Sequence, residues 1–322
     1  MIQRYLSNWH NAWNEFWFRP RASSILAIMR ILVGSMLLYT HAIWTLELVT
    51  FFGFENSAIP YDYRSLFPHV GAFSWSHFDW VDSPAWLWGT HLFALCVFLC
   101  FMIGFMTRAT GVLACLFAIS YANRASGALF GLDQINVFLT LYLALSHCGS
   151  IYSVDARLKR NKTTDRDPDS SEGWQGRGVV SVANTIATRL IQVHICIVYL
   201  FAGLGKAQGT SWWNGEAVWG TLASYEYQTL ELTWMHEFMW LINLLTFLTV
   251  AWEISYAFLI WHKLTRPLFL LMAVFVHLGI GLAMGMFTFG LIMLYANVAF
   301  ICLLYTSPSP RDQRGSRMPS SA

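Results

Sequence analysis

Charged residues are scarce in this chain, and their scarcity excludes most soluble folds. Asp, Glu, Lys and Arg make up 12% of the 322 residues, whereas a soluble domain carries about 25%. Hydrophobic residues make up 56%, so too few charges remain to cover a globular surface of this size. The same composition excludes intrinsic disorder. A net charge of +2 is too small to indicate a nucleic-acid partner, and the composition indicates a membrane protein.

Familiar catalytic and metal-binding motifs are also missing. The sequence has no serine nucleophile elbow, no phosphate-binding loop and no HExxH zinc motif. No CxxC pair indicates a structural metal, and the histidines lack the paired spacing of a haem site. The cysteines in or beside apolar runs are Cys96, Cys100, Cys115, Cys148 and Cys196. Such thiols usually pack as small hydrophobic groups, so we expect neither a disulfide framework nor a metal site.

Apolar stretches predict the architecture. A bilayer core about 30 Å thick needs about 20 apolar residues per helix. Runs of this length predict spans at 23–46, 85–106, 109–130, 132–151, 183–204, 237–261, 266–286 and 288–304. Asn123, Arg124 and Ser126 interrupt the third span, and the last two spans are nearly contiguous. The predicted fold is an all-α, polytopic membrane helical bundle with about eight transmembrane helices.

Basic residues predict the side of the membrane on which each connecting segment lies. Eight spans place residues 1–22, the turn at Arg108, the 152–182 loop and the turn at Lys263 and Arg266 on one side. These segments hold most of the Lys and Arg residues, and the positive-inside rule therefore assigns them to the cytoplasm. The opposite side is mostly acidic. We predict a multi-pass protein of the cell (inner) membrane with both termini cytoplasmic.

Two long segments and the tail complete the predicted organisation. Segments 47–84 and 205–236 fall on the external side and are rich in aromatic residues. Because aromatic rings favour the headgroup region, we expect these segments to lie on the membrane rather than form a soluble domain. Residues 305–322 read like the translation of a sequencing adaptor, which predicts a non-native tail; a flexible cytoplasmic tail is the alternative. The membrane domain is thus predicted at 23–304.

Lys206 is the first candidate for chemistry. It closes the fifth predicted span after Gly203 and Gly205, and a Trp pair follows it. The glycines allow a second helix to approach closely or the backbone to bend. An amine held against poorly hydrated aromatic rings loses its proton more readily and can act as a general base, and the nearest acid in the following segment is Glu216. The alternative is a lysine that reaches the interface from a helix end.

Four more polar groups deserve separate interpretations. His277 and Glu253 lie in apolar runs, where ionisable groups tend to face a bundle interior and mark function. A hydrogen-bonded contact between helices is the other interpretation of His277. Asp133 begins the fourth span, where it is equally suited to cap a helix. Arg30 lies in the first turns of the first span, and we expect its side chain to snorkel to the membrane edge.

Five short segments carry a family resemblance. They are Leu26 to Gly34 with Arg30, Asn123-Arg124 leading to Gly131-Leu132-Asp133-Gln134, Tyr152 to Asp155, Phe201 to Lys206 with its Trp-rich sequel, and His277-Leu278 with Gly285-Met286-Phe287. Together they resemble the HTTM (horizontally transferred transmembrane) domain, the membrane part of vitamin K-dependent gamma-carboxylases and their bacterial relatives. The resemblance covers about 22–302, and the Ala-Gly-Leu-x-Lys element is its most specific part.

The resemblance implies a site that uses a reduced quinone. In the animal carboxylase a lysine in the matching element is the proposed base that deprotonates vitamin K hydroquinone, and Lys206 matches that lysine. We assign substrate-binding roles to His277, Trp212, Trp213, Asp133 and Gln134. The 322 residues include no counterpart of the large lumenal domain that binds the carboxylase's protein substrate, so we do not expect them to dock that substrate in the same way.

Two functions from different classes therefore remain open. The first is a quinone- or isoprenoid-lipid-dependent, carboxylase-like enzyme or oxidoreductase that acts at the external face. The second is a non-enzymatic membrane scaffold or maturation factor for exported proteins. If the chain is an enzyme, Lys206 should face an apolar cavity large enough for a ring. If it is a scaffold, Lys206 should lie at the surface that faces lipid or solvent.

Labelling of introduced cysteines tests the predicted topology. In a chain stripped of its native cysteines, a cysteine at Asp169 should react with an impermeant maleimide only after the cells are permeabilised, because the 152–182 loop is predicted to be cytoplasmic. A cysteine at Glu226, in an external segment, should react on intact cells. Labelling at position 169 on intact cells would overturn the eight-span topology.

Overall fold

The computed structural model describes residues 1–53, 57–59, 74–164, 178–226 and 228–301. Within these ranges the fold is helical apart from two short strands, β1 (Arg21–Ala22) and β2 (Val180–Ser181). The all-α prediction is therefore confirmed. The predicted tail at 305–322 lies outside the described residues, as do parts of the 47–84 segment and of the 152–182 loop.

Helices occur at all eight positions where the sequence predicts spans. They are α2 (Ser24–Trp44), α5 (Pro84–Ile103), α6 (Thr107–Arg124), α7 (Gly131–Ala144), α9 (Val182–Lys206), α12 (Met239–Leu259), α13 (Arg266–Met284) and α14 (Phe287–Ile301). In the part of the chain described, five helical stretches are long and apolar enough to cross a membrane: Ser24–Phe52, Pro84–Ile103, Val182–Lys206, Thr233–Leu259 and Arg266–Met284. By length or hydropathy α6, α7 and α14 fall short, so the predicted count of eight is not confirmed.

Helix α1 (Ile2–Phe18) precedes α2, and short helices fill the connections. They are η1 (Thr45–Glu47), α3 (Leu48–Phe52), η2 (His77–Trp80), η3 (Ser126–Ala128), α8 (Val154–Thr164), α10 (Thr210–Trp213), α11 (Ala217–Leu222) and η5 (Thr233–Phe238), where η marks a 3₁₀ helix. The last three follow Lys206 and build the segment predicted at 205–236.

Local sequence signals account for several helix ends. The side chains of Ser83 and Ser181 accept hydrogen bonds from backbone N–H groups in the first turns of α5 and α9. Gly104 and Gly285 end α5 and α13 in the left-handed conformation, with φ of 73° and 69°, which glycine adopts without steric cost. The turn at Gly285 separates α13 from α14, so the nearly contiguous apolar stretch forms two helices.

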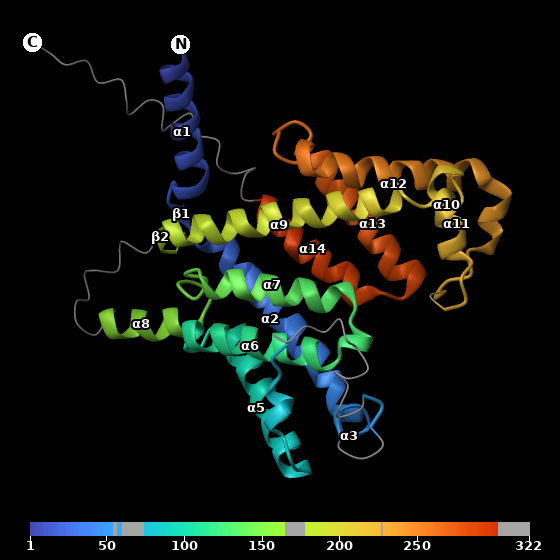
Figure 1. Cartoon of the computed structure of the whole chain (residues 1–322). Coiled ribbons are helices and arrows are strands. Elements are labelled where there is room, and N and C mark those ends of the chain that lie inside the picture. Colours follow the sequence, from blue (N-terminus) through green and yellow to red (C-terminus); the bar gives the residue numbers. More distant parts are fainter. Residues whose placement is uncertain (54–56, 60–73, 165–177, 227, 302–322) are drawn as a thin grey trace, which may run out of the picture.

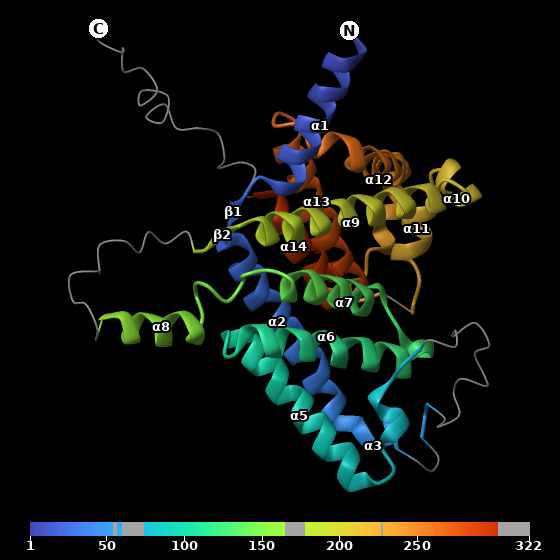
Figure 2. The ribbon, with the colours of Figure 1, turned by 60° about the vertical axis from the view of Figure 1, so that its left-hand side comes forward.

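The helices form two groups joined by α14 (Figures 1 and 2). In the first half α2 packs against α5 and α7, and α6 packs between α5 and α7. In the second half α9 packs against α12, and α12 against α13. Since α14 contacts α2, α7, α9 and α13, it connects the two groups. The antiparallel pairing of β1 with β2 places the starts of α2 and α9 at the same end of the bundle, as the predicted topology requires.

Arg30 differs from its predicted behaviour. Its side chain is fully buried rather than extended to the membrane edge, and its Nη2 donates a hydrogen bond to the backbone oxygen of Tyr152 at 2.5 Å. The guanidinium lies against Gly104, where a Cβ atom would collide with it. Asp155 caps α6 by accepting hydrogen bonds from the backbone of Met106 and Thr107 at 2.8 Å. Two segments that carry the family resemblance therefore pack together.

Of the two glycines that were predicted to allow a second helix to approach or the backbone to bend, Gly203 permits the close approach. A Cβ atom at Gly203 would lie 2.7 Å from Cγ1 of Ile254 and 3.0 Å from Cβ of Glu253. A Cβ atom at Gly205 would meet nothing within 4 Å outside its own helical backbone. The approach of α12 to α9 thus depends on Gly203.

Paired alanine substitutions test this contact. Gly203→Ala should lower the thermal midpoint of the detergent-solubilised protein, because overpacking typically costs about 1–3 kcal/mol. Gly205→Ala is the matched control and should be neutral or slightly stabilising, since alanine is favoured over glycine within helices by roughly 1 kcal/mol. Equal midpoints for the two variants would contradict the packing described.

Candidate functional site

An ion pair between α9 and α12 is the candidate site in the second half. Lys206 is the last residue of α9, and its Nζ lies 2.9 Å from Oε1 and 2.8 Å from Oε2 of Glu253. The Lys206 side chain is 28% exposed and the Glu253 side chain 9%. The carboxylate therefore belongs to the interior and the ammonium to its rim. Because Glu253 is 47 positions from Lys206, the sequence showed an intramembrane acid but not its partner.

Buried hydrogen bonds join the helices around this pair. Tyr199 lies two turns before Lys206 on α9, and its hydroxyl is 2.7 Å from Nε2 of His277 on α13. Asn297 of α14 donates to that hydroxyl at 3.0 Å and accepts from the hydroxyl of Tyr256, on α12, at 2.5 Å. The four side chains in these hydrogen bonds are all buried: Tyr199, Tyr256, His277 and Asn297. Asn297 was not among the predicted site residues, although its interruption of an apolar run is a sequence signal for a polar contact between helices.

Three of the six predicted site residues, Lys206, Trp212 and His277, lie in or beside this group of side chains. The ammonium of Lys206 lies 5.5 Å from the ring centroid of Trp212, within the range of a cation–π interaction. His277 is buried and shares its hydrogen bond with Tyr199, which matches the helix-contact interpretation. Trp213 is exposed, and its Nε1 donates to the backbone oxygen of Ala207 at 2.7 Å. Lys206, Glu253, Trp212, Tyr199 and His277 are called the Lys206 site below.

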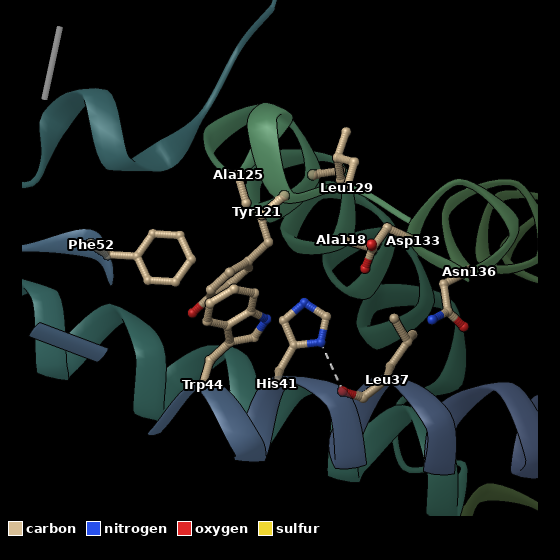
Figure 3. Close-up of a pocket in the computed structure, with 12 residues that line it drawn as sticks. Leu37, His41, Trp44, Phe52, Ala118, Tyr121, Ala125, Leu129, Asp133 and Asn136 are labelled. Carbon is tan, nitrogen blue, oxygen red and sulfur yellow. Dashed lines mark hydrogen bonds between the residues drawn. The ribbon is translucent and has the colours of Figure 1, made fainter. Parts of the chain in front are cut away.

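The other predicted residues lie in the first half. A small cavity is lined by residues of α2, α3, α6, α7 and the adjoining turns (Figure 3). His41, Tyr121, Asp133 and Asn136 are among its lining residues. Asp133 also accepts a hydrogen bond from the backbone N–H that precedes α7, so it has the predicted capping role. Gln134 is exposed. Lys206 does not line this cavity.

Three histidines gather around Tyr121 beside the cavity. Nδ1 of His91 lies 2.6 Å from the Tyr121 hydroxyl, and its Nε2 lies 2.9 Å from Oγ1 of Thr45. The rings of His41 and His77 lie 4.6 and 5.5 Å from the Tyr121 ring. This cluster could not be predicted from the sequence, because the histidines come from three different elements. Over the described ranges, no group of three or more His, Cys, Asp or Glu residues is arranged to hold a metal ion.

His77 lies outside the predicted spans and is kept neutral by burial. Its Nδ1 and its backbone N–H both meet Oγ of Ser120, at 2.5 and 2.7 Å. Burial lowers the pKa of His77 from 6.5 to about 4, although the nearby Asp79 opposes the shift. His77 thereby attaches the segment before α5 to α6 in its uncharged form.

Acid should weaken this attachment. The pKa of about 4 in the folded protein is below the value of 6.5 expected when the chain unfolds, so the unfolded chain binds more protons between these values. The free energy of unfolding should therefore fall as the pH drops from about 6.5 to about 4. Thermal midpoints measured across this window should fall less for His77→Gln than for the wild type. Parallel pH profiles would show that His77 is not the group responsible.

Comparison with known proteins gives no match: no family model, curated protein or solved structure is similar to the chain. The resemblance to the HTTM domain therefore stays a prediction. The fold itself defines the class of protein, which is an all-α protein whose apolar helices suit a lipid bilayer.

Proposed function

We propose that the chain is a membrane-embedded enzyme that removes a proton from a lipid-soluble ring substrate, such as a reduced quinone, at the Lys206–Glu253 pair. The pair is the observation that carries the proposal. Transferring two charges from water into apolar surroundings costs about as much as their attraction returns, so stability alone does not favour such a pair. Ionisable groups within predicted spans more often serve a substrate or proton path.

The pair assigns different roles from those predicted by the sequence. In this proposal Lys206, which donates to the carboxylate of Glu253, acts as a cation instead of the neutral base of the sequence hypothesis. Glu253 accepts the proton instead. Lys206 remains positively charged and stabilises the negative charge that develops on the substrate oxygen. Tyr199 and His277 hold α9 against α13 and keep the pair in place.

The residues around the pair suit a ring that carries oxygen substituents. The carboxylate of Glu253 can accept from a hydroxyl group, the ammonium of Lys206 can donate to an oxygen, and the indole of Trp212 supplies a flat apolar face. A reduced quinone supplies the acidic hydroxyl when it is bound. Phe201 and Leu204 on the same end of α9 are exposed, so an isoprenoid tail could remain in the bilayer. Carboxylation or oxidation after proton removal follows from the family resemblance alone.

The position of the site in the membrane is also part of the proposal. The positive-inside distribution puts the start of α9 at the cytoplasmic face of the cell (inner) membrane and Lys206 near the external face. Both termini are then cytoplasmic. The site takes its substrate from the outer leaflet.

A non-enzymatic membrane scaffold or maturation factor for exported proteins is the second candidate. The cavity described above lies in the first half and does not reach Lys206. In this role the ion pair only joins α9 to α12. The segment after Lys206 exposes Trp213, Tyr225 and Trp234, which an exported partner would cover.

Turnover in membranes that carry variants separates the two roles. The probe is a short-chain reduced quinone, and the rate at which it is oxidised is the measured turnover. Glu253→Gln should reduce this rate by about 10²–10⁴-fold, because a general base contributes that much. Lys206→Gln should impair turnover as well, and Lys206→Arg should retain part of it, since guanidinium keeps the positive charge. Glu216→Gln is the matched control, because that acid is exposed in the segment after Lys206.

Two outcomes would decide against the proposal. If Glu253→Gln retains wild-type turnover, the pair is not the proton acceptor. If the wild type shows no turnover and mass spectrometry of extracted lipids finds no co-purifying quinone, the scaffold role is favoured. Inactivity of Lys206→Arg together with full activity of Glu253→Gln would restore the neutral-lysine mechanism.

A further inference from the structure

Helix α1 gathers three tryptophan side chains on one face. Trp9, Trp13 and Trp17 recur every four residues, a spacing that places them along one stripe of a helix. Their rings contact one another in series, with centroids 5.5 Å apart for Trp9 and Trp13 and 5.9 Å apart for Trp13 and Trp17. The rest of the helix is mainly polar, with Asn, Gln, Ser and Arg residues. The helix is therefore amphipathic and its apolar face is indole-rich.

Among the residues that the structure describes, contacts to the bundle gather at the C-terminal end of this helix. Nε of Arg189, on α9, donates to the backbone oxygen of Phe16 at 3.1 Å, and its guanidinium lies 4.0 Å from the Phe16 ring centroid. The Phe16 ring in turn lies 5.6 Å from that of Trp261, just after α12. Trp17 is half-buried beside this contact, whereas Trp13 and Trp9 are exposed. The face that carries Trp17 near the bundle thus continues outward as Trp13 and Trp9.

The direction of α1 differs from that of α9, the helix to which it is attached. In Figures 1 and 2 α1 runs across the direction of α9, at the end where α2 and α9 begin. Both of those helices are long and apolar enough to cross a membrane, so their first residues mark one membrane boundary. A short link from Arg19 to Ser23 is all that separates α1 from α2. Helix α1 therefore extends along this boundary.

The side chains on the apolar face are uncovered in the protein itself. Trp9 is 58% exposed, Trp13 48% and Leu6 57%. Indole rings favour the headgroup region of a bilayer over both water and the acyl core. On the first turns of α2, Ile28 and Ile31 are also exposed. Residues 1–22 hold three Arg and a single acid, which complements anionic headgroups.

We infer that α1 is an interfacial helix that lies in the headgroup region of the leaflet where α2 and α9 begin, with the face formed by Leu6, Trp9 and Trp13 turned toward the acyl chains. Its partner is a lipid surface rather than a protein. The helix anchors this end of α9 through Arg189 and fixes its depth in the leaflet. The inference does not depend on the chemistry of the Lys206 site.

Spin labels on the two faces of α1 test the inference. The full chain, stripped of native cysteines and with single nitroxide labels, is reconstituted in vesicles of phosphatidylcholine and phosphatidylglycerol. Labels at Leu6 and Trp13 should be several-fold more accessible to oxygen than to a water-soluble nickel chelate. Labels at Asn8 and Asn11, which are exposed on the polar part of α1, are the matched controls and should show the reverse preference. The label at Leu6 leaves all three indoles in place.

Two results would overturn the inference. Preference for the nickel chelate at all four positions would place the whole helix in water. Spin–spin broadening at Leu6 and Trp13, lost on dilution with unlabelled protein, would show that a second copy covers the face instead of lipid.

Discussion

The contact between α9 and α12 positions two charges that apolar surroundings would otherwise exclude. Gly203 has no side chain, so the backbone of α12 approaches α9 closely enough for Glu253 to reach Lys206 one turn further on. A carboxylate at this depth requires a counter-charge, because an unpaired buried ion is far more costly than a paired one. Helix packing and site chemistry therefore depend on the same few residues.

Around that contact, polar side chains join helices that apolar packing alone would connect less specifically. Asn297 of α14 links Tyr199 and Tyr256, and through Tyr199 it reaches His277 on α13. Since apolar helices gain little from the hydrophobic effect within lipid, such hydrogen bonds help to select one arrangement of α9, α12, α13 and α14. The first half has its own polar centre around Tyr121. The two centres are separate, which divides residues that the sequence hypothesis had placed in one site.

Apolar runs were a good guide to where helices form, because a segment of about 20 apolar residues has few alternatives in lipid. They were a poorer guide to the number of spans, since α7 and α14 are short and α6 has Arg108 and Arg124 at its ends. Arg30 shows a related limit. Its position near a helix start predicted an escape to the membrane edge, but neighbouring helices and the segment at Tyr152 enclose it.

The sequence by itself determined the all-α class, the positions of the helices and the presence of Lys206, Glu253 and His277 as ionisable groups within apolar runs. Composition and hydrophobic length suffice for these features, because each is a local property of the chain. Only the tertiary structure decided that Glu253 faces Lys206, that Tyr199 faces His277, and that Asp133 lines a cavity away from Lys206. Those pairings join residues far apart in the chain, and they depend on which faces of α9, α12 and α13 meet.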